Sequence, residues 1–241
     1  MPSEPPETVL ILGGTAEAFH LAERLVERGD LRVITSLAGR TQDPVLPPGE
    51  VRIGGFGGAE GLAAFMLENG VTRLVDATHP FAHRISQNAI KAAAQAGIAL
   101  EHLVRPGWER QPGDHWHEVT SLDEAARALP AGATVFLALG RQYLDAFVAR
   151  SDCRFVIRMV DAPQTPLAFT DYTLILGRPS ADATREADLF SAHGITHVVC
   201  RNSGGAAGYG KIEAARQLRL PVVILSRRIE PTSPTLEKGR S

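Results

Sequence analysis

Short apolar segments alternate along the first half of the chain with segments whose apolar residues recur every three or four positions. The first apolar run, 9–12, ends in two glycines and is followed by residues 16–28, which keep helical spacing. Beyond it we predict strands at 31–35, 51–53, 73–77 and 100–104, and helices at 61–69 and 82–96. Strands rich in Val, Ile and Leu, separated by amphipathic helices, are typical of a mostly parallel sheet covered on both faces.

The same alternation returns in the second half. Here we predict strands at 134–139, 155–160, 172–176, 196–200 and 222–226, and helices at 142–149, 181–193 and 211–218. Residues 106–118 lack this periodicity and contain Pro, Gly and Trp, so we expect the crossover between two lobes there. The pattern predicts an α/β fold with two Rossmann-like lobes of mostly parallel sheets, 1–106 and 107–241. The polar segment 230–241 is expected to be a frayed tail.

Composition and charge narrow the class of function. The 241 residues are 44% hydrophobic and 22% charged, as in an ordinary soluble globular protein. The net charge of −2 gives no bulk attraction to nucleic acid or to an anionic membrane. No apolar run approaches the roughly 18 residues of a membrane helix. Cys153 and Cys200 are expected to be buried thiols in a reducing compartment, which predicts a cytoplasmic protein.

The strongest local signal is the glycine turn Gly13-Gly14-Thr15 after the first predicted strand. Such a turn lets a pyrophosphate approach the backbone and the N-terminus of the following helix. The spacing departs from the common dinucleotide fingerprint, because Thr15 stands at its second glycine position and Ala18 at its third. Alanine is tolerated at the third position, and a threonine hydroxyl could bond a phosphate. We predict nucleotide binding here; the alternative is a plain glycine turn.

The end of the second predicted strand indicates which nucleotide is bound. An NAD site usually carries an acidic residue about 20 positions after the glycines. This chain has Ser36 and Arg40 there and no carboxylate. A hydroxyl and a guanidinium suit a 2′-phosphate, which an acid would repel. The pattern therefore favours NADP over NAD; the alternative is that Arg40 is an exposed loop arginine.

Two later loops carry further polar side chains. Thr78 and His79 follow the strand 73–77, and ligands of open α/β sheets gather at the carboxyl ends of the strands. His79 and His83 are four residues apart, as some metal ligands are, but Pro80 stands between them and no third ligand has a fitting spacing, so no metal site is predicted. In the glycine-rich loop 201–211, phosphate-loop spacing holds up to the lysine, but Ile212 stands where an ATPase needs Ser or Thr.

Five motifs together resemble the precorrin-6A reductase family of cobalamin biosynthesis, over about residues 9–228. They are Ile-Leu-Gly-Gly-Thr-Ala-Glu from position 11, Ser-Leu-Ala-Gly-Arg from 36, Gly-Gly-Phe-Gly-Gly from 54, Asp-Ala-Thr-His-Pro-Phe-Ala from 76, and Asn-Ser-Gly-Gly from 202 with Lys211. The resemblance implies an NADPH-dependent reduction of one C=C bond of the precorrin-6A macrocycle to precorrin-6B, without a metal. It also implies a cofactor cleft between the two lobes and hand-over of the product to the next pathway enzyme.

The resemblance also implies the site residues by position. The implied cofactor-binding set is Gly13, Gly14 and Thr15 for the pyrophosphate, Ser36 and Arg40 for the 2′-phosphate, Gly55 and Phe56 by the adenine, Thr78 and His79 by the nicotinamide ribose, and Asn202, Ser203 and Lys211 from the other lobe. A proton must also reach the substrate. His79 and Lys211 are the candidate catalytic residues, with ordered water and Tyr209 as open alternatives.

The acetate and propionate arms of the macrocycle call for scattered cations. We expect Arg84, Arg141 and Arg201 to bind substrate; the other candidates at strand ends or loops are Arg105, Arg158, Arg178, Lys211 and Arg227. The sequence leaves open whether the substrate is metal-free or contains cobalt, and which oligomer forms. An NADP-binding regulatory protein without turnover is the alternative function. A carbonyl reductase is disfavoured, because no tyrosine is followed by a lysine four residues later.

Overall fold

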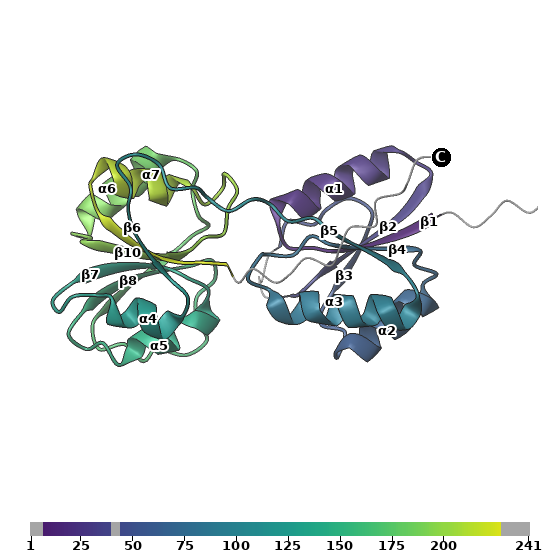
Figure 1. Ribbon diagram of the computed structural model, residues 1–241, viewed down its shortest axis with the longest axis horizontal. Helices are drawn as coiled ribbons and strands as arrows, with labels where there is room; N and C mark the ends of the chain where they lie inside the picture. The colour runs from purple at the N-terminus through teal and green to yellow at the C-terminus, as the bar shows by residue number, and fades with distance from the viewer. Residues whose placement is uncertain (1–6, 40–43, 228–241) are drawn as a thin grey trace, which may run out of the picture. The chain divides into compact units, whose positions relative to one another are not determined.

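The computed structural model describes residues 7–39 and 44–227 and divides the chain into two compact units. Unit 1 ends at Gly107 and also takes in Ser203–Gly205. Unit 2 runs from Trp108 to Asn202 and resumes at Ala206. Each unit contains one parallel sheet with helices on both faces, as the α/β pattern predicted (Figure 1).

Five strands form the sheet of unit 1: β1 (Glu7–Leu12), β2 (Leu31–Leu37), β3 (Glu50–Ile53), β4 (Arg73–Asp76) and β5 (Ala99–His102). Their order in space is β3-β2-β1-β4-β5, and every neighbouring pair is parallel. The chain therefore reverses its direction of winding between β1 and β4. In open α/β sheets, ligands bind outside the carboxyl ends of the strands at such a reversal.

Alternating residues of β1 explain how both faces of this sheet are covered. Val9 and Ile11 pack with α1 (Ala16–Glu27). Leu10 and Leu12 face the other way and pack with α2 (Ala59–Glu68) and α3 (His83–Ala96), which Figure 1 shows on the side opposite α1. In a strand buried on both faces, side chains of both orientations pack against apolar neighbours. This accounts for the continuous apolar run in the sequence.

Six strands form the sheet of unit 2: β6 (His115–Val119), β7 (Thr134–Ala138), β8 (Arg154–Met159), β9 (Tyr172–Leu176), β10 (His197–Arg201) and β11 (Pro221–Leu225). They are parallel in the order β6-β11-β10-β7-β8-β9, so the winding reverses between β7 and β10. One face packs on α6 (Ala183–Ala192) and α7 (Gly210–Gln217) through an apolar core that contains Phe136 and Phe190. The short helices α4 (Leu122–Arg127) and α5 (Asp145–Val148) lie on the opposite face (Figure 1).

Two predictions for the second half were wrong in detail. The end of the segment interpreted as an irregular crossover is the edge strand β6. Among the described strands it pairs only with β11, and it has polar residues at three of its five positions. The helix predicted at 142–149 is broken into a 3₁₀ turn, Arg141–Tyr143, and the single turn α5. The Tyr143 N–H donates to Gly140 O, which is the tighter bonding of a 3₁₀ turn.

Both cysteines are free and buried, as expected. Across the described residues, no helix is long and apolar enough to cross a membrane. The predicted tail at 230–241 and the predicted phosphate ligand Arg40 lie outside the described residues.

Candidate functional site

The glycine turn of unit 1 lies at the point where the strand order reverses. The Gly13 N–H donates to Ser36 O at 2.9 Å, which ties the turn to the end of β2. A Cβ on Gly13 would lie 2.9 Å from Cγ2 of Thr35, and Gly14 has a φ of +104°. A side chain is therefore excluded by crowding at the first position and by backbone conformation at the second. The turn leads directly into the N-terminus of α1.

Thr15 is the N-cap of α1. Its hydroxyl accepts a hydrogen bond from the Ala18 N–H at 3.1 Å and donates its proton to Ala77 O at 2.8 Å. The hydroxyl thus joins the glycine turn to the loop that follows β4. Because its only proton is already donated, a phosphate at this turn would take its hydrogen bonds from backbone N–H groups, as at other helix N-termini.

Glu17, in the first turn of α1, joins this helix to the Ser203–Gly205 segment of unit 1. Arg105 Nη1 lies 2.9 Å from a carboxylate oxygen of Glu17, and Arg105 Nε donates to Ser203 O at 2.7 Å. Burial opposes the charge of Glu17, but its own backbone N–H and the positive charge of Arg105 hold the pKa of this carboxyl below its usual value. The charge of Arg105 is therefore balanced by the Glu17 carboxylate. The Arg105 side chain in turn fixes Ser203 by donating to its carbonyl.

Beside Ser36 stands a guanidinium that the sequence analysis missed. Arg52 of β3 is the register partner of Ser36, and its Nη1 lies 3.5 Å from Ser36 Oγ. Arg52 also donates to Gly54 O at 2.6 Å and Gly55 O at 2.7 Å, and its Cζ lies 3.9 Å from the centre of the Phe56 ring. Arg52 thus fixes the glycine-rich loop after β3. Only the pairing of β2 with β3 reveals this, because the two residues are not close in sequence.

Thr78 and His79 follow β4 at the same edge of the sheet. Asp76 Oδ1 accepts hydrogen bonds from the backbone N–H of Thr78 at 3.1 Å and from its hydroxyl at 2.6 Å. His79 Nδ1 accepts from the Phe81 N–H at 3.2 Å. A ring nitrogen that accepts a hydrogen bond carries no proton, so this contact fits the His79 tautomer with its proton on Nε2.

Asp76 also faces His102 at the end of β5, a pair that the sequence analysis did not single out. Asp76 Oδ2 lies 3.6 Å from His102 Nδ1; the aspartate side chain is 4% exposed and the histidine 41%. Burial disfavours the charged carboxylate, but His102, Ser86 and Thr78 outweigh it and lower the pKa of Asp76. The carboxylate in turn raises the pKa of His102 against a smaller opposing effect of burial.

Asn202 and Lys211, both predicted to close on the cofactor, lie in unit 2. The Asn202 side chain pairs with the backbone of Trp108, accepting from its N–H at 2.7 Å and donating to its carbonyl at 2.9 Å. Lys211 is buried in the first turn of α7, where its ammonium donates to Gly208 O and lies 4.5 Å from the centre of the Trp108 ring. Burial lowers the pKa of Lys211. The side chains of Asn202 and Lys211 therefore hold backbone segments of unit 2 in place through these hydrogen bonds.

The arginines predicted to bind substrate differ in how they are engaged. Arg84 and Arg141 are exposed, and Arg201 stacks over Tyr143 with 4.8 Å between its Cζ and the ring centre. Arg158 is instead buried and makes two hydrogen bonds to the Glu186 carboxylate, at 2.8 and 2.9 Å. A buried pair of this kind is already neutral, so Arg158 holds α6 to the sheet.

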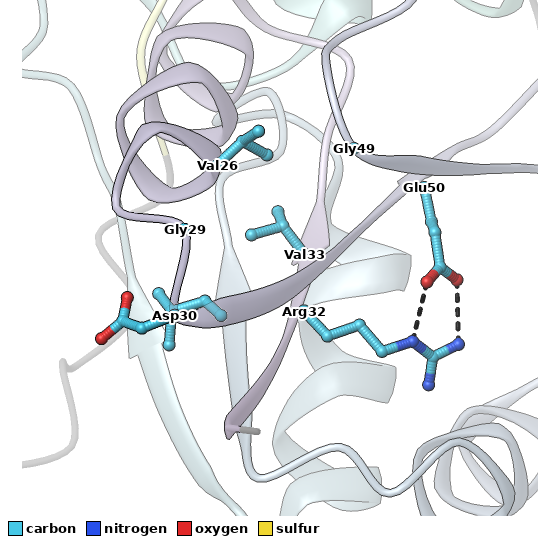
Figure 2. Close-up of a pocket in the computed structure, with 8 residues that line it drawn as sticks. Val26, Gly29, Asp30, Arg32, Val33, Gly49 and Glu50 are labelled. Carbon is cyan, nitrogen blue, oxygen red and sulfur yellow. Dashed lines mark hydrogen bonds and ion pairs between the residues drawn. The ribbon is translucent and has the colours of Figure 1, made fainter. Parts of the chain in front are cut away.

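A shallow hollow in unit 1 lies away from all of these residues. Figure 2 shows it at the amino end of β2, where Arg32 forms two hydrogen bonds of 2.8 Å with Glu50. Its lining is formed by Val26, Gly29, Asp30, Leu31, Arg32, Val33, Gly49 and Glu50. The candidate residues of unit 1 gather instead at the carboxyl edge. Within the described part of the chain, no group of three or more His, Cys, Asp or Glu side chains is placed to hold a metal ion.

Comparisons with known proteins agree over nearly the whole chain. The family model for the precorrin-6x reductases CbiJ/CobK matches residues 8–239. A precorrin-6A reductase of Sinorhizobium sp is 48% identical over 230 residues, which are 95% of this chain and 88% of the relative. A cobalt-precorrin-6A reductase of Priestia megaterium is 30% identical over 247 residues, covering 96% and 92% of the two chains. A solved structure of CobK precorrin-6A reductase is similar with a TM-score of 0.90 and 42% identity, over 94% of this chain and 90% of that chain.

Proposed function

The chain belongs to the precorrin-6x reductase family CbiJ/CobK, and we propose that it uses NADPH to reduce one C=C bond of metal-free precorrin-6A. It is an oxidoreductase of cobalamin biosynthesis that acts on a CH–CH group. The main support for a dinucleotide cofactor is the glycine turn at the reversal of strand order, which leads into the N-terminus of α1. NADPH, when bound, supplies the hydride.

The residues at the carboxyl edge of unit 1 fit such a cofactor. The turn at Gly13 and Gly14 leaves the backbone open to a pyrophosphate, because no side chain fits there. Ser36 supplies a hydroxyl at the end of β2, and none of the described residues 36–39 there is acidic. These features support a 2′-phosphate over a bare ribose. The proposed cofactor-binding residues are Gly13, Gly14, Thr15, Ser36, Arg40, Gly55, Phe56, Thr78, His79, Asn202, Ser203 and Lys211.

His79 and Lys211 remain the residues proposed to act at the reacting end of the cofactor. Because Nδ1 of His79 accepts the Phe81 N–H, we propose that Nε2 donates a hydrogen bond to the ribose or the carboxamide. Lys211 combines burial with a lowered pKa, a property that is common among residues of functional sites. For the carboxylate arms of the substrate we propose Arg84, Arg141 and Arg201.

The metal-free macrocycle is favoured by the degree of similarity. The precorrin-6A reductase of Sinorhizobium sp is 48% identical to this chain, whereas the cobalt-precorrin-6A reductase of Priestia megaterium is 30% identical. Hand-over of the product to the next pathway enzyme stays a prediction. The cytoplasmic location also stays a prediction, and the two free thiols support it.

Anaerobic oxidation of NADPH, followed at 340 nm with precorrin-6A, tests the proposal. We expect turnover with NADPH, at least about tenfold lower kcat/KM with NADH, and a preference for precorrin-6A over its cobalt-containing counterpart. Tight binding of NADPH without turnover on either macrocycle would contradict an enzyme and support a regulatory protein that only holds the cofactor.

A further inference from the structure

Asp76 and His102 form a carboxylate–imidazole pair that lies outside the proposed cofactor-binding and substrate-binding sets. The two are register partners at the carboxyl ends of the parallel strands β4 and β5, so their side chains leave the same face of the sheet. The carboxylate is buried, whereas 41% of the histidine side chain is exposed. Nδ1 of the ring faces Asp76. The opposite nitrogen, Nε2, is therefore the one able to reach a bound molecule.

Hydrogen bonds link the pair to the candidate cofactor turn. Thr78 occupies Asp76 Oδ1 with two hydrogen bonds, so Oδ2 is directed at His102. The backbone of Asp76 accepts from the Leu103 N–H at 2.9 Å, which fixes the end of β5. The next residue of the chain, Ala77, accepts the hydroxyl proton of Thr15, the cap of the glycine turn. A continuous set of contacts thus joins His102 to the turn within unit 1.

The charges around His102 favour its protonated form. Asp76 is the charged group that raises the pKa of His102. Of the neighbouring strands' other charges, Arg73 and Glu101 pair with each other at 3.6 Å. Helix α3 adds His83, Arg84 and Lys91, none of which contributes to the shift. His79 differs, because its Nδ1 accepts a backbone N–H and protonation of that nitrogen would break the bond.

We propose that His102 is the general acid of the reduction, with Asp76 as the positioning residue that faces Nδ1 and orients the ring. This inference rests on the proposed function. One carbon of the substrate double bond receives the hydride of the reductant, which loses two electrons. The π-electron pair then takes the proton from His102 Nε2 and forms the second C–H bond. The neutral imidazole regains its proton from water, which reaches the exposed side of the ring.

Substitution of His102 by Gln tests the proposal, because glutamine keeps hydrogen-bonding capacity but has no acidic proton. We expect kcat at pH 7 to fall by about 100-fold, with the dissociation constant of NADPH unchanged within about twofold. The alkaline limb of the kcat profile should disappear with the histidine. In the free protein, the NMR titration of the His102 ring should give a pKa above the ordinary histidine value in the wild type, and a lower one in Asp76→Asn.

Two controls separate the chemical role from a structural one. His20→Gln removes a histidine that also pairs with a carboxylate, Glu23, but on the exposed surface of α1, and should keep full kcat. His102→Ala should regain part of its activity when imidazole is added, which a structural defect would not allow. Retention of kcat within about threefold in His102→Gln, or loss of NADPH binding in that variant, would overturn the proposal. A wild-type chain inactive on precorrin-6A would overturn the proposed function first and this inference with it.

Discussion

The arginines near the two carboxyl edges show that position alone does not make a residue a ligand. Arg105 is neutralised by Glu17, and Arg158 by Glu186, so neither has a free charge to offer a carboxylate arm. Arg84 and Arg141 are exposed and keep theirs. At the residue scale, the set of cations available to a polycarboxylate substrate is therefore smaller than the set of cations that the sequence places near strand ends.

The contrast between Arg40 and Arg52 gives a prediction at the same scale. Arg52 donates to two carbonyls of the loop after β3, so Arg52→Ala should weaken the binding of NADPH and NADH alike. Arg40→Ala should instead lower the preference for NADPH over NADH by about tenfold, the effect of losing one hydrogen bond to a charged group. The measurement is kcat/KM with each cofactor for both variants. A selectivity that falls in Arg52→Ala and not in Arg40→Ala would reverse the assignment.

At the scale of elements, side chains at strand ends hold the loops of the candidate site in place. Thr15 ties the start of α1 to the loop after β4, and Asp76 ties that loop to the end of β5. Since each contact joins segments far apart in sequence, the loops at the carboxyl edge depend on the packing of the whole sheet. Loops held by such contacts can orient a bound cofactor.

The Asp76–His102 contact predicts how the stability of unit 1 depends on pH. The pKa of His102 is raised on folding, so its contribution is fully present below the ordinary histidine pKa and is lost as pH rises through the folded value. The pKa of Asp76 is lowered, so its contribution is lost as pH falls through that lowered value. The contact should therefore stabilise most in mildly acidic solution, by no more than about 1 kcal/mol because the ring is partly exposed.

Urea unfolding of the wild type and His102→Gln at several pH values measures this effect. The difference in free energy of unfolding should be largest between the two folded pKa values and should shrink as pH rises beyond that of His102. If the difference in free energy of unfolding stayed constant from mildly acidic to alkaline pH, the contact would not be ionic. The effect of the substitution would then come from packing.

The same elements show what the sequence could predict. The apolar run before Gly13 indicated a strand buried on both faces, and β1 is such a strand. Edge strands are harder to predict from sequence. Strand β6 has the sequence His-Trp-His-Glu-Val, which is too polar to be distinguished from a loop unless its partner β11 is known. The roles of Arg52 and His102 lay beyond the sequence for a related reason. Each depends on a register partner, Ser36 or Asp76, which only the pairing of parallel strands reveals.

At the scale of the whole molecule, the chain builds two parallel sheets, each with its own reversal of strand order. The glycine turn, Ser36 and the loop after β4 belong to unit 1, and Ser203 joins them there through Arg105. Asn202, Lys211 and Arg201 belong to unit 2. The predicted set of cofactor residues thus draws on both units. A reductase must hold both a dinucleotide and a macrocycle, and two reversals offer two places for ligands to bind.

Transfer of deuterium from labelled NADPH to the macrocycle tests whether this protein reduces precorrin-6A by hydride transfer. The chain is incubated anaerobically with precorrin-6A and NADPH deuterated at either hydrogen of C4, and the tetrapyrrole product is analysed by mass spectrometry. We expect one deuterium on carbon from one of the two labelled forms, and a second hydrogen that comes from water. A product without deuterium from either form, while NADPH binds tightly, would contradict a hydride transfer by this protein.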